Sequence, residues 1–91
     1  MLRIDERSEA QSATLALSGS LTNEYIAELE RAIGHVRAGK RVTLDLAQLQ
    51  SVDRAGLAFL ARAMAAAIRL QDCPPYIRLW IAQERRGVPI R

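Results

Sequence analysis

A strand that leads through a short loop into a helix is the feature that most constrains how this chain can fold. Apolar and polar residues alternate over 42–46, as expected of a strand with one buried face. A loop is predicted over 47–51, and 53–57 then begins a helix with an acidic, a basic and a small residue followed by glycine. The first backbone N–H groups of such a helix can hold an anion or dock a partner. We therefore expect a binding surface at the start of this helix.

The composition is that of a small soluble globular protein. The chain has 91 residues, of which 49% are hydrophobic and 25% are charged. This length predicts one domain spanning 1–91. The net charge of +3 is spread along the chain, with one local cluster at Arg85, Arg86 and Arg91. Such a mild excess favours a solvated surface over nucleic-acid binding, and weak nucleic-acid binding through the arginines is kept as an alternative.

The residues also exclude several classes of site. Cys73 is the single cysteine, so no intrachain disulfide can form, and no Cys or His spacing is typical of a metal site. The segment 1–6 has no apolar signal core. The longest apolar run, 55–68, contains Arg62 and is shorter than the roughly 20 residues of a membrane-spanning helix. We expect a cytoplasmic protein with no cofactor and no direct membrane insertion.

No combination of residues indicates catalysis. His35 is the single histidine, and no Ser, Cys or Asp partner lies near it in the sequence. Asp45 has no second acid positioned beside it for acid–base chemistry. We therefore predict that the protein is not an enzyme.

Hydrophobic periodicity predicts two strands and a helix in the first part of the chain. The helix has isoleucine, leucine and valine at spacings of three or four, and Gly39 is expected to stop it. The predicted elements are a strand over 2–5, a turn over 6–12, a strand over 14–18 with Leu15 and Leu17 inward, and a helix from Thr22 or Asn23 to Ala38.

The helix that begins near Asp53 has three distinct faces. One faces the core, a second is also apolar and is a candidate homodimer contact, and a third is small and basic. The face toward the core consists of Leu57, Leu60, Ala61 and Met64. The second apolar face consists of Phe59, Ala63 and Ala66, and the small, basic face consists of Arg54, Ala58, Arg62 and Ala65.

Two interpretations of the last part of the chain are open. In the favoured one, the second helix ends near Ala66, a short strand contains Ile68 and Leu70, and a third helix starts at Pro74 or Pro75. In the other, the second helix runs to residue 70 and 76–81 forms a strand. The favoured interpretation yields an α/β domain of four strands and three helices in two layers.

The strand 42–46, the turn 52–56 and the helix 57–60 together resemble the STAS domain, the family of sulfate transporters and anti-sigma-factor antagonists. The segment 15–21 resembles the family's second strand and the loop after it, so the resemblance covers most of residues 13 to 70. Within the family, the chain is most similar to short, stand-alone bacterial members. The resemblance implies a small, four-stranded mixed sheet with about three helices packed mainly on one face.

The resemblance also implies a partner and a mode of regulation. Founding members bind anti-sigma factors that are also kinases, and phosphorylation of the residue just before the glycine of the turn breaks the complex. Here that residue is Ala55, which has no hydroxyl, and Arg54 changes the charge beside it. Ser51 is the nearest hydroxyl, in the predicted loop before the helix. We expect a binding module without the family's phosphorylation switch.

Two kinds of partner are consistent with the resemblance. The first is an anti-sigma factor or kinase-like protein, and the second is the ATPase of a lipid-transporting ABC system, to which the chain would be a cytoplasmic accessory subunit. In either case we predict docking through the helix start. The predicted partner-binding residues are Asp53, Arg54, Ala55, Gly56, Ala58 and Arg62.

Each of these residues also has a purely structural interpretation. Asp53 is favoured as an N-cap that accepts backbone N–H groups. Gly56 is favoured as a point of close packing on the sheet. Arg54 and Arg62 could belong to an ordinary solvated helix face. Tyr76 and Trp80 are expected to pack at the edge of the core.

Overall fold

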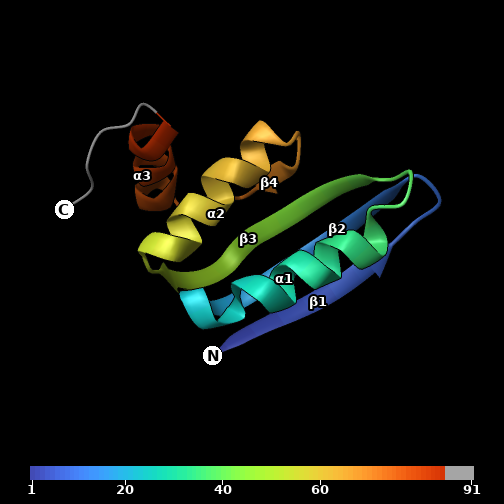
Figure 1. The fold of residues 1–91 in the computed structure, drawn as a ribbon, viewed down its shortest axis with the longest axis horizontal. Helices are drawn as coiled ribbons and strands as arrows, with labels where there is room; N and C mark the ends of the chain where they lie inside the picture. The colour runs from blue at the N-terminus through green and yellow to red at the C-terminus, as the bar shows by residue number, and fades with distance from the viewer. Residues whose placement is uncertain (86–91) are drawn as a thin grey trace.

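The chain folds into a four-stranded mixed sheet, as expected (Figure 1). The structure is a computed structural model, and it describes residues 1–85. The strands follow one another across the sheet in chain order; β1 is antiparallel to β2, whereas β2, β3 and β4 are mutually parallel. The strands are β1 (Leu2–Ser8), β2 (Ser12–Leu21), β3 (Arg41–Val52) and β4 (Arg69–Gln71).

Three helices complete the fold. Helices α1 and α2 connect the parallel strands and lie along one face of the sheet, and α3 packs beside α2 (Figure 1). Parallel neighbours need such crossover connections, because a tight turn cannot reverse the chain between them. The helices are α1 (Asn23–Val36), α2 (Arg54–Ala65) and α3 (Pro75–Arg85). The expected two-layer α/β architecture is therefore confirmed.

The core lies between the sheet and the helices. Leu15 and Leu17 of β2, which were predicted to face inward, are fully buried, as are Leu44 and Leu46 of β3. Leu29 of α1 and Leu57 and Leu60 of α2 meet them from the helical layer. Removing this much apolar surface from water is the main stabilising contribution in a domain of this size.

The prediction for the end of the chain is confirmed in its favoured form. α2 ends at Ala65, Ala67 adopts a positive φ of 66°, and the chain turns into β4. Two prolines precede and begin α3, where a missing N–H group costs no helical hydrogen bond. The alternative, with a helix to residue 70 and a strand over 76–81, is wrong. Of the arginine cluster predicted at the C-terminus, Arg86 and Arg91 lie outside the described residues.

Several boundaries differ from the predictions. The strand predicted to contain Ile68 and Leu70 begins only at Arg69, so that Ile68 lies just before it. The segment 47–51 is not a loop, because β3 continues to Val52 and pairs with β2 as far as Leu21. The turn predicted over 6–12 shrinks to 9–11, because β1 and β2 extend their antiparallel pairing toward it. α1 ends two residues earlier than predicted, at Val36. Pairing between strands therefore continues beyond the stretch where side chains alternate cleanly.

The orientation of α2 also differs from the prediction. Met64 was predicted to face the core, but it is 38% exposed. Phe59 and Ala63, from the stripe considered for a homodimer, are buried beside α1, whereas Ala66 is exposed. The reason is that α1 covers this side of α2, so the stripe offers little surface to a second copy. Among residues 1–85, no helix is long and apolar enough to cross a membrane.

Candidate functional site

Asp53 joins the starts of two helices. One carboxylate oxygen, Oδ1, accepts a hydrogen bond from the backbone N–H of Gly56 at 2.8 Å. The other, Oδ2, accepts one from the backbone N–H of Asn23 at 2.9 Å. The predicted N-cap of α2 is confirmed, and the same side chain also serves the first turn of α1. A negative charge at this point interacts favourably with the positive ends of both helix dipoles.

Gly56 sets how closely α2 approaches the sheet. A Cβ atom at this position would lie 2.3 Å from the backbone oxygen of Leu21, at the end of β2. The same oxygen accepts a hydrogen bond from the backbone N–H of Asp53 at 3.2 Å. The prediction of close packing is confirmed, since no side chain fits between this turn and β2. The start of α2 is therefore held rigidly against the sheet.

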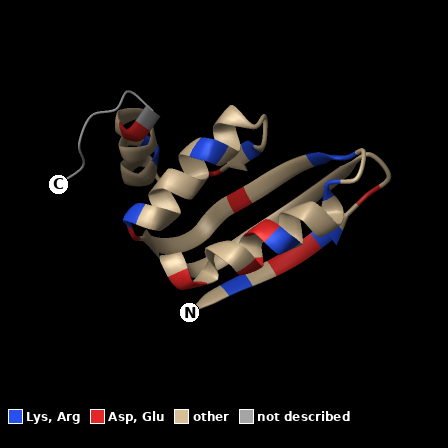
Figure 2. Cartoon of the chain, in the orientation of Figure 1, with Lys and Arg blue, Asp and Glu red and all other residues tan. Residues whose placement is uncertain are grey.

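The outward face of α2 carries the remaining predicted residues. Arg54, Ala58 and Arg62 follow one another at intervals of four, so they form one stripe along the helix. The two arginines are exposed, while Ala55 and Ala58 are half-buried. Figure 2 shows basic positions on α2 both at its start and farther along. Eight residues at the rise of an α-helix separate the arginines by about 12 Å, so they do not form a single concentrated charge.

A shallow groove of about 450 Å³ runs along this face. Three small residues, Ala58, Ala61 and Ala65, line it together with Arg62 and Glu84. The guanidinium carbon of Arg62 lies 5.8 Å from the centre of the Phe59 ring, which helps to orient it. The sequence analysis missed Glu84, because no local pattern indicates that α3 would bring an acidic side chain beside α2.

The hydroxyl groups near the helix start are placed differently from the prediction. Ser51 lies in β3 rather than in a loop, and its Oγ is 2.7 Å from the Oγ of Ser20 on the neighbouring strand. Ala55 occupies the first turn of α2. The start of α2 therefore presents no hydroxyl between Asp53 and Gly56.

Tyr76 ties α3 to the end of β3. Its hydroxyl donates a hydrogen bond of 2.8 Å to the backbone oxygen of Gln50. Its ring packs edge to face with Trp80, with 5.5 Å between ring centres. Trp80 is half-buried against the core, as predicted for the core edge, while Tyr76 is 43% exposed. This link holds α3, and with it Glu84, beside α2.

Replacing Tyr76 with phenylalanine should lower the free energy of unfolding by about 1 kcal/mol, because one hydrogen bond to a backbone carbonyl is lost. Urea denaturation measures the change. Tyr25→Phe is the matched control, since the Tyr25 hydroxyl has no hydrogen-bond partner among residues 1–85. Equal stability of the two variants would show that the link between Tyr76 and Gln50 contributes nothing.

The other candidate chemical groups lie apart from this surface. His35 is exposed on α1. Cys73 is buried; burial raises the pKa of its thiol, and the Arg78 guanidinium acts in the opposite direction. A thiol in this state stays protonated near neutral pH and is a poor nucleophile. Within the described part of the chain, no three His, Cys, Asp or Glu side chains gather in a way that could hold a metal ion.

Comparison with known proteins identifies the fold independently. The family model described as "Mlab, STAS domain" matches residues 4–72. A crystal structure of an antisigma-factor antagonist STAS domain from Rhodobacter sphaeroides is similar in fold, with a TM-score of 0.63 and 14% identity over 78% of this chain and 86% of that one. No curated protein matches the chain.

Two further solved structures share the fold. One is Mglu, with a TM-score of 0.59 and 25% identity over 74% of this chain, but only 18% of the Mglu chain is covered. The other is an uncharacterized protein of the DUF3478 family from Shewanella loihica PV-4, which has a SpoIIAA-like fold. Its TM-score is 0.53, with 13% identity over 71% of this chain and 56% of that one.

Proposed function

Since the chain belongs to the STAS domain family, we propose that it is a non-catalytic module that binds a partner protein through the start and outward face of α2. The partner in this proposal resembles an anti-sigma factor, and binding takes place in the bacterial cytoplasm without a cofactor. The observation that carries the proposal is the rigid presentation of an exposed Arg54 at a helix start that Asp53 and Gly56 hold against the sheet.

Each residue of the surface has a defined part in the proposed complex. Arg54 and Arg62 contact acidic side chains of the partner at two points along α2. Ala55 and Ala58 let the partner approach closely, because their side chains end at the Cβ atom. Asp53 and Gly56 act from within, by fixing the direction in which the helix start points.

The charges near the surface support an acidic contact. Among residues 1–85 the single ion pair is Arg3–Asp5, so neither Arg54 nor Arg62 is held in an ion pair with an acid of the described chain. Glu84 lines the same groove as Arg62 and gives this part of the surface a mixed charge. A complementary partner would therefore place an acid at Arg54 and a basic or polar group near Glu84.

Binding in this proposal is constitutive. The family's switch adds about two negative charges at the helix start by phosphorylation of a hydroxyl. Ala55 cannot accept a phosphate, and Ser51, the nearest hydroxyl in the sequence, has its Oγ 2.7 Å from that of Ser20 on the sheet. Control of the complex would then rest on the amounts of the two proteins rather than on modification of this turn.

The test is a pull-down from the native host followed by affinity measurement with the captured protein. Arg54→Glu should weaken binding by about tenfold or more, because it places like charges opposite each other. Arg31→Glu, at an exposed position on α1, is the matched charge reversal and should leave binding unchanged. Equal loss in both variants, or none in Arg54→Glu, would refute the proposed surface. Recovery of an ATPase that binds in the same way would support the proposed surface. It would refute the anti-sigma factor as the partner and identify an ATPase in its place.

A further inference from the structure

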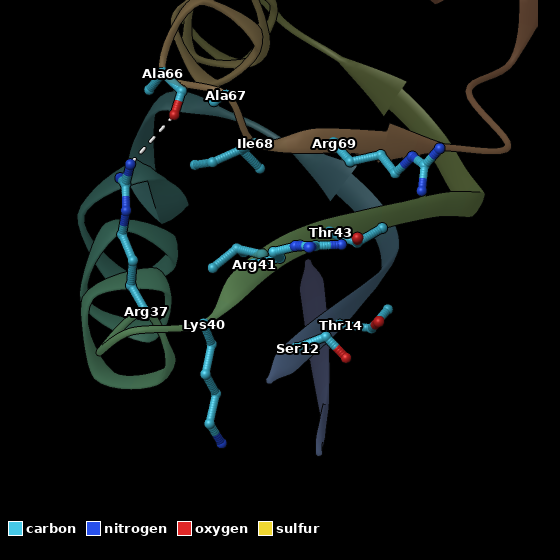
Figure 3. A pocket seen from close by; sticks show the side chains of 11 residues that line it. Ser12, Thr14, Arg37, Lys40, Arg41, Thr43, Ala66, Ala67, Ile68 and Arg69 are labelled. Atoms are coloured by element: carbon cyan, nitrogen blue, oxygen red, sulfur yellow. Dashed lines mark hydrogen bonds between the residues drawn. The ribbon is translucent and has the colours of Figure 1, made fainter. Parts of the chain in front are cut away.

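A second, basic hollow lies at the opposite end of β3 from the proposed partner surface. It has a volume of about 600 Å³, and Arg37, Lys40, Arg41 and Arg69 line it. None of the residues that line it is acidic. Figure 3 shows these side chains coming from the end of α1, the start of β3 and β4. The partner surface follows the last residue of β3, whereas this hollow surrounds its first residues.

Strand pairing explains how the hollow is built. Thr14 of β2 pairs with Thr43 of β3, which in turn pairs with Arg69 of β4, so three side chains form one row across the sheet. Ser12 pairs with Arg41 in the next row of the same face. This is the face away from α1 and α2, because the alternate residues of these strands are buried under the helices. Figure 3 shows these side chains extending to the same side.

Two of the four cations already have a structural role. Nη2 of Arg37 donates a hydrogen bond of 3.2 Å to the backbone oxygen of Ala66, just past the end of α2. Nζ of Lys40 donates one of 2.8 Å to the hydroxyl of Ser8. The first bond satisfies a backbone carbonyl at the C-terminal end of α2, and the second links Lys40 to the last residue of β1. Both bonds hold their cations at the edge of the hollow.

Arg41 and Arg69 have no such role. Both are exposed on strands, and neither guanidinium forms a hydrogen bond or an ion pair with another residue of 1–85. The acid nearest to the hollow is Glu9, whose Oε1 accepts a hydrogen bond of 3.4 Å from the Ser12 hydroxyl. Asp5 and Asp45 lie in the following row, where Asp5 is paired with Arg3 and Asp45 accepts the N–H of Ala47. The two guanidinium groups and the hydroxyls of Thr14 and Thr43 therefore form a set of hydrogen-bond donors that no acid of the described residues occupies.

We propose that this hollow binds a phosphorylated small molecule, through Arg41 and Arg69 together with the neighbouring hydroxyls of Thr14 and Thr43. Guanidinium groups bind phosphate oxygens in a bidentate manner, and the threonine hydroxyls donate to the remaining oxygens. The volume exceeds that of one phosphate and lies in the range of small-molecule sites. No aromatic side chain lines the hollow, so recognition rests on the phosphate groups rather than on stacking with a base.

Inorganic pyrophosphate is the probe, and two-dimensional NMR of the ¹⁵N-labelled chain is the measurement. Saturable shifts of the amide signals at 12–14, 41–43 and 69 are expected. The double variant Arg41→Gln/Arg69→Gln should weaken binding by tenfold or more, while Arg31→Gln should bind like the original protein. Thermal unfolding of both variants verifies that these exposed substitutions leave the fold intact.

Three NMR results would overturn the proposal. The first is the absence of saturable binding at millimolar pyrophosphate, and the second is equal affinity in the double variant. The third is a set of shifts confined to the start of α2, which would place the anion at the partner surface instead.

A flotation assay with vesicles distinguishes a lipid headgroup from a free phosphorylated molecule as the source of the phosphate group. Retention on phosphatidylglycerol vesicles but not on phosphatidylcholine vesicles, lost in the double variant, would overturn the small-molecule assignment and replace it with a lipid headgroup. Pyrophosphate binding without such retention supports a free phosphorylated molecule. Because the site and its variants are separate from α2, either result leaves the partner proposal untouched.

Discussion

Gly56→Ala is expected to destabilise the protein by about 3 kcal/mol, the upper part of the range for added bulk in a tightly packed site. The new methyl group would lie 2.3 Å from the backbone oxygen of Leu21, and a backbone atom at the end of a paired strand cannot move aside easily. The helix start would have to lift from the sheet, which also lengthens the hydrogen bond between Asp53 and Leu21. Urea denaturation followed by circular dichroism measures the loss.

The matched control is Gly34→Ala on α1. A Cβ atom at Gly34 meets nothing within 4 Å, and the residue lies inside the helix with an ordinary negative φ. Alanine there should stabilise the protein by about 0.5 to 1 kcal/mol, since it has the higher helix propensity. The two substitutions are chemically identical, but their effects on the free energy of unfolding are expected to have opposite signs. A stabilising effect of Gly56→Ala would contradict the close approach of α2 to β2.

Asp53→Ala is expected to lower the free energy of unfolding by about 2 kcal/mol. This is the upper end of the range for loss of an N-cap, and it applies here because one side chain serves both α1 and α2. The backbone N–H groups of Asn23 and Gly56 would both lose their acceptor. The same change should weaken partner binding, because the helix start would no longer be held in one direction.

Two further substitutions make this prediction specific. Asp53→Asn keeps one carbonyl oxygen and so should lose about half as much stability. Asp5→Ala removes a carboxylate from an exposed pair with Arg3 and should cost no more than about 0.5 kcal/mol. If Asp53→Ala cost as little as Asp5→Ala, the double cap would have no energetic importance.

The cap at Asp53 and the close packing at Gly56 are confirmed, while the role of the predicted residues in binding a partner stays a prediction. Asp53 and Gly56 could be interpreted from the sequence because capping and close packing at a helix start depend on residues a few positions apart. The stripe of Arg54, Ala58 and Arg62 follows from helical periodicity in the same way. Glu84 and the second hydrogen bond of Asp53, to Asn23, could not be predicted, because they join segments about 20 to 30 residues apart.

Local patterns determined the order and kind of the elements as far as α2, and they favoured the correct interpretation after it without excluding the other. The alternation around Leu15 and Leu44 indicated the buried face of each central strand, and two adjacent prolines favoured a helix start where α3 begins. These signals are readable because burial on one side imposes a period of two on a strand and 3.6 on a helix. They act between residues that are near in the chain.

The tertiary structure decided what depends on a second layer or a neighbouring strand. β3 continues through 47–51 because β2 offers it hydrogen-bond partners, with register shifts after Ala16 and after Gly19 that keep the pair together. α2 buries Phe59 rather than Met64 because α1 lies on that side. The row of Thr14, Thr43 and Arg69 exists only through the register of three strands. Contacts between distant segments carry no local period, and therefore only the folded chain reveals them.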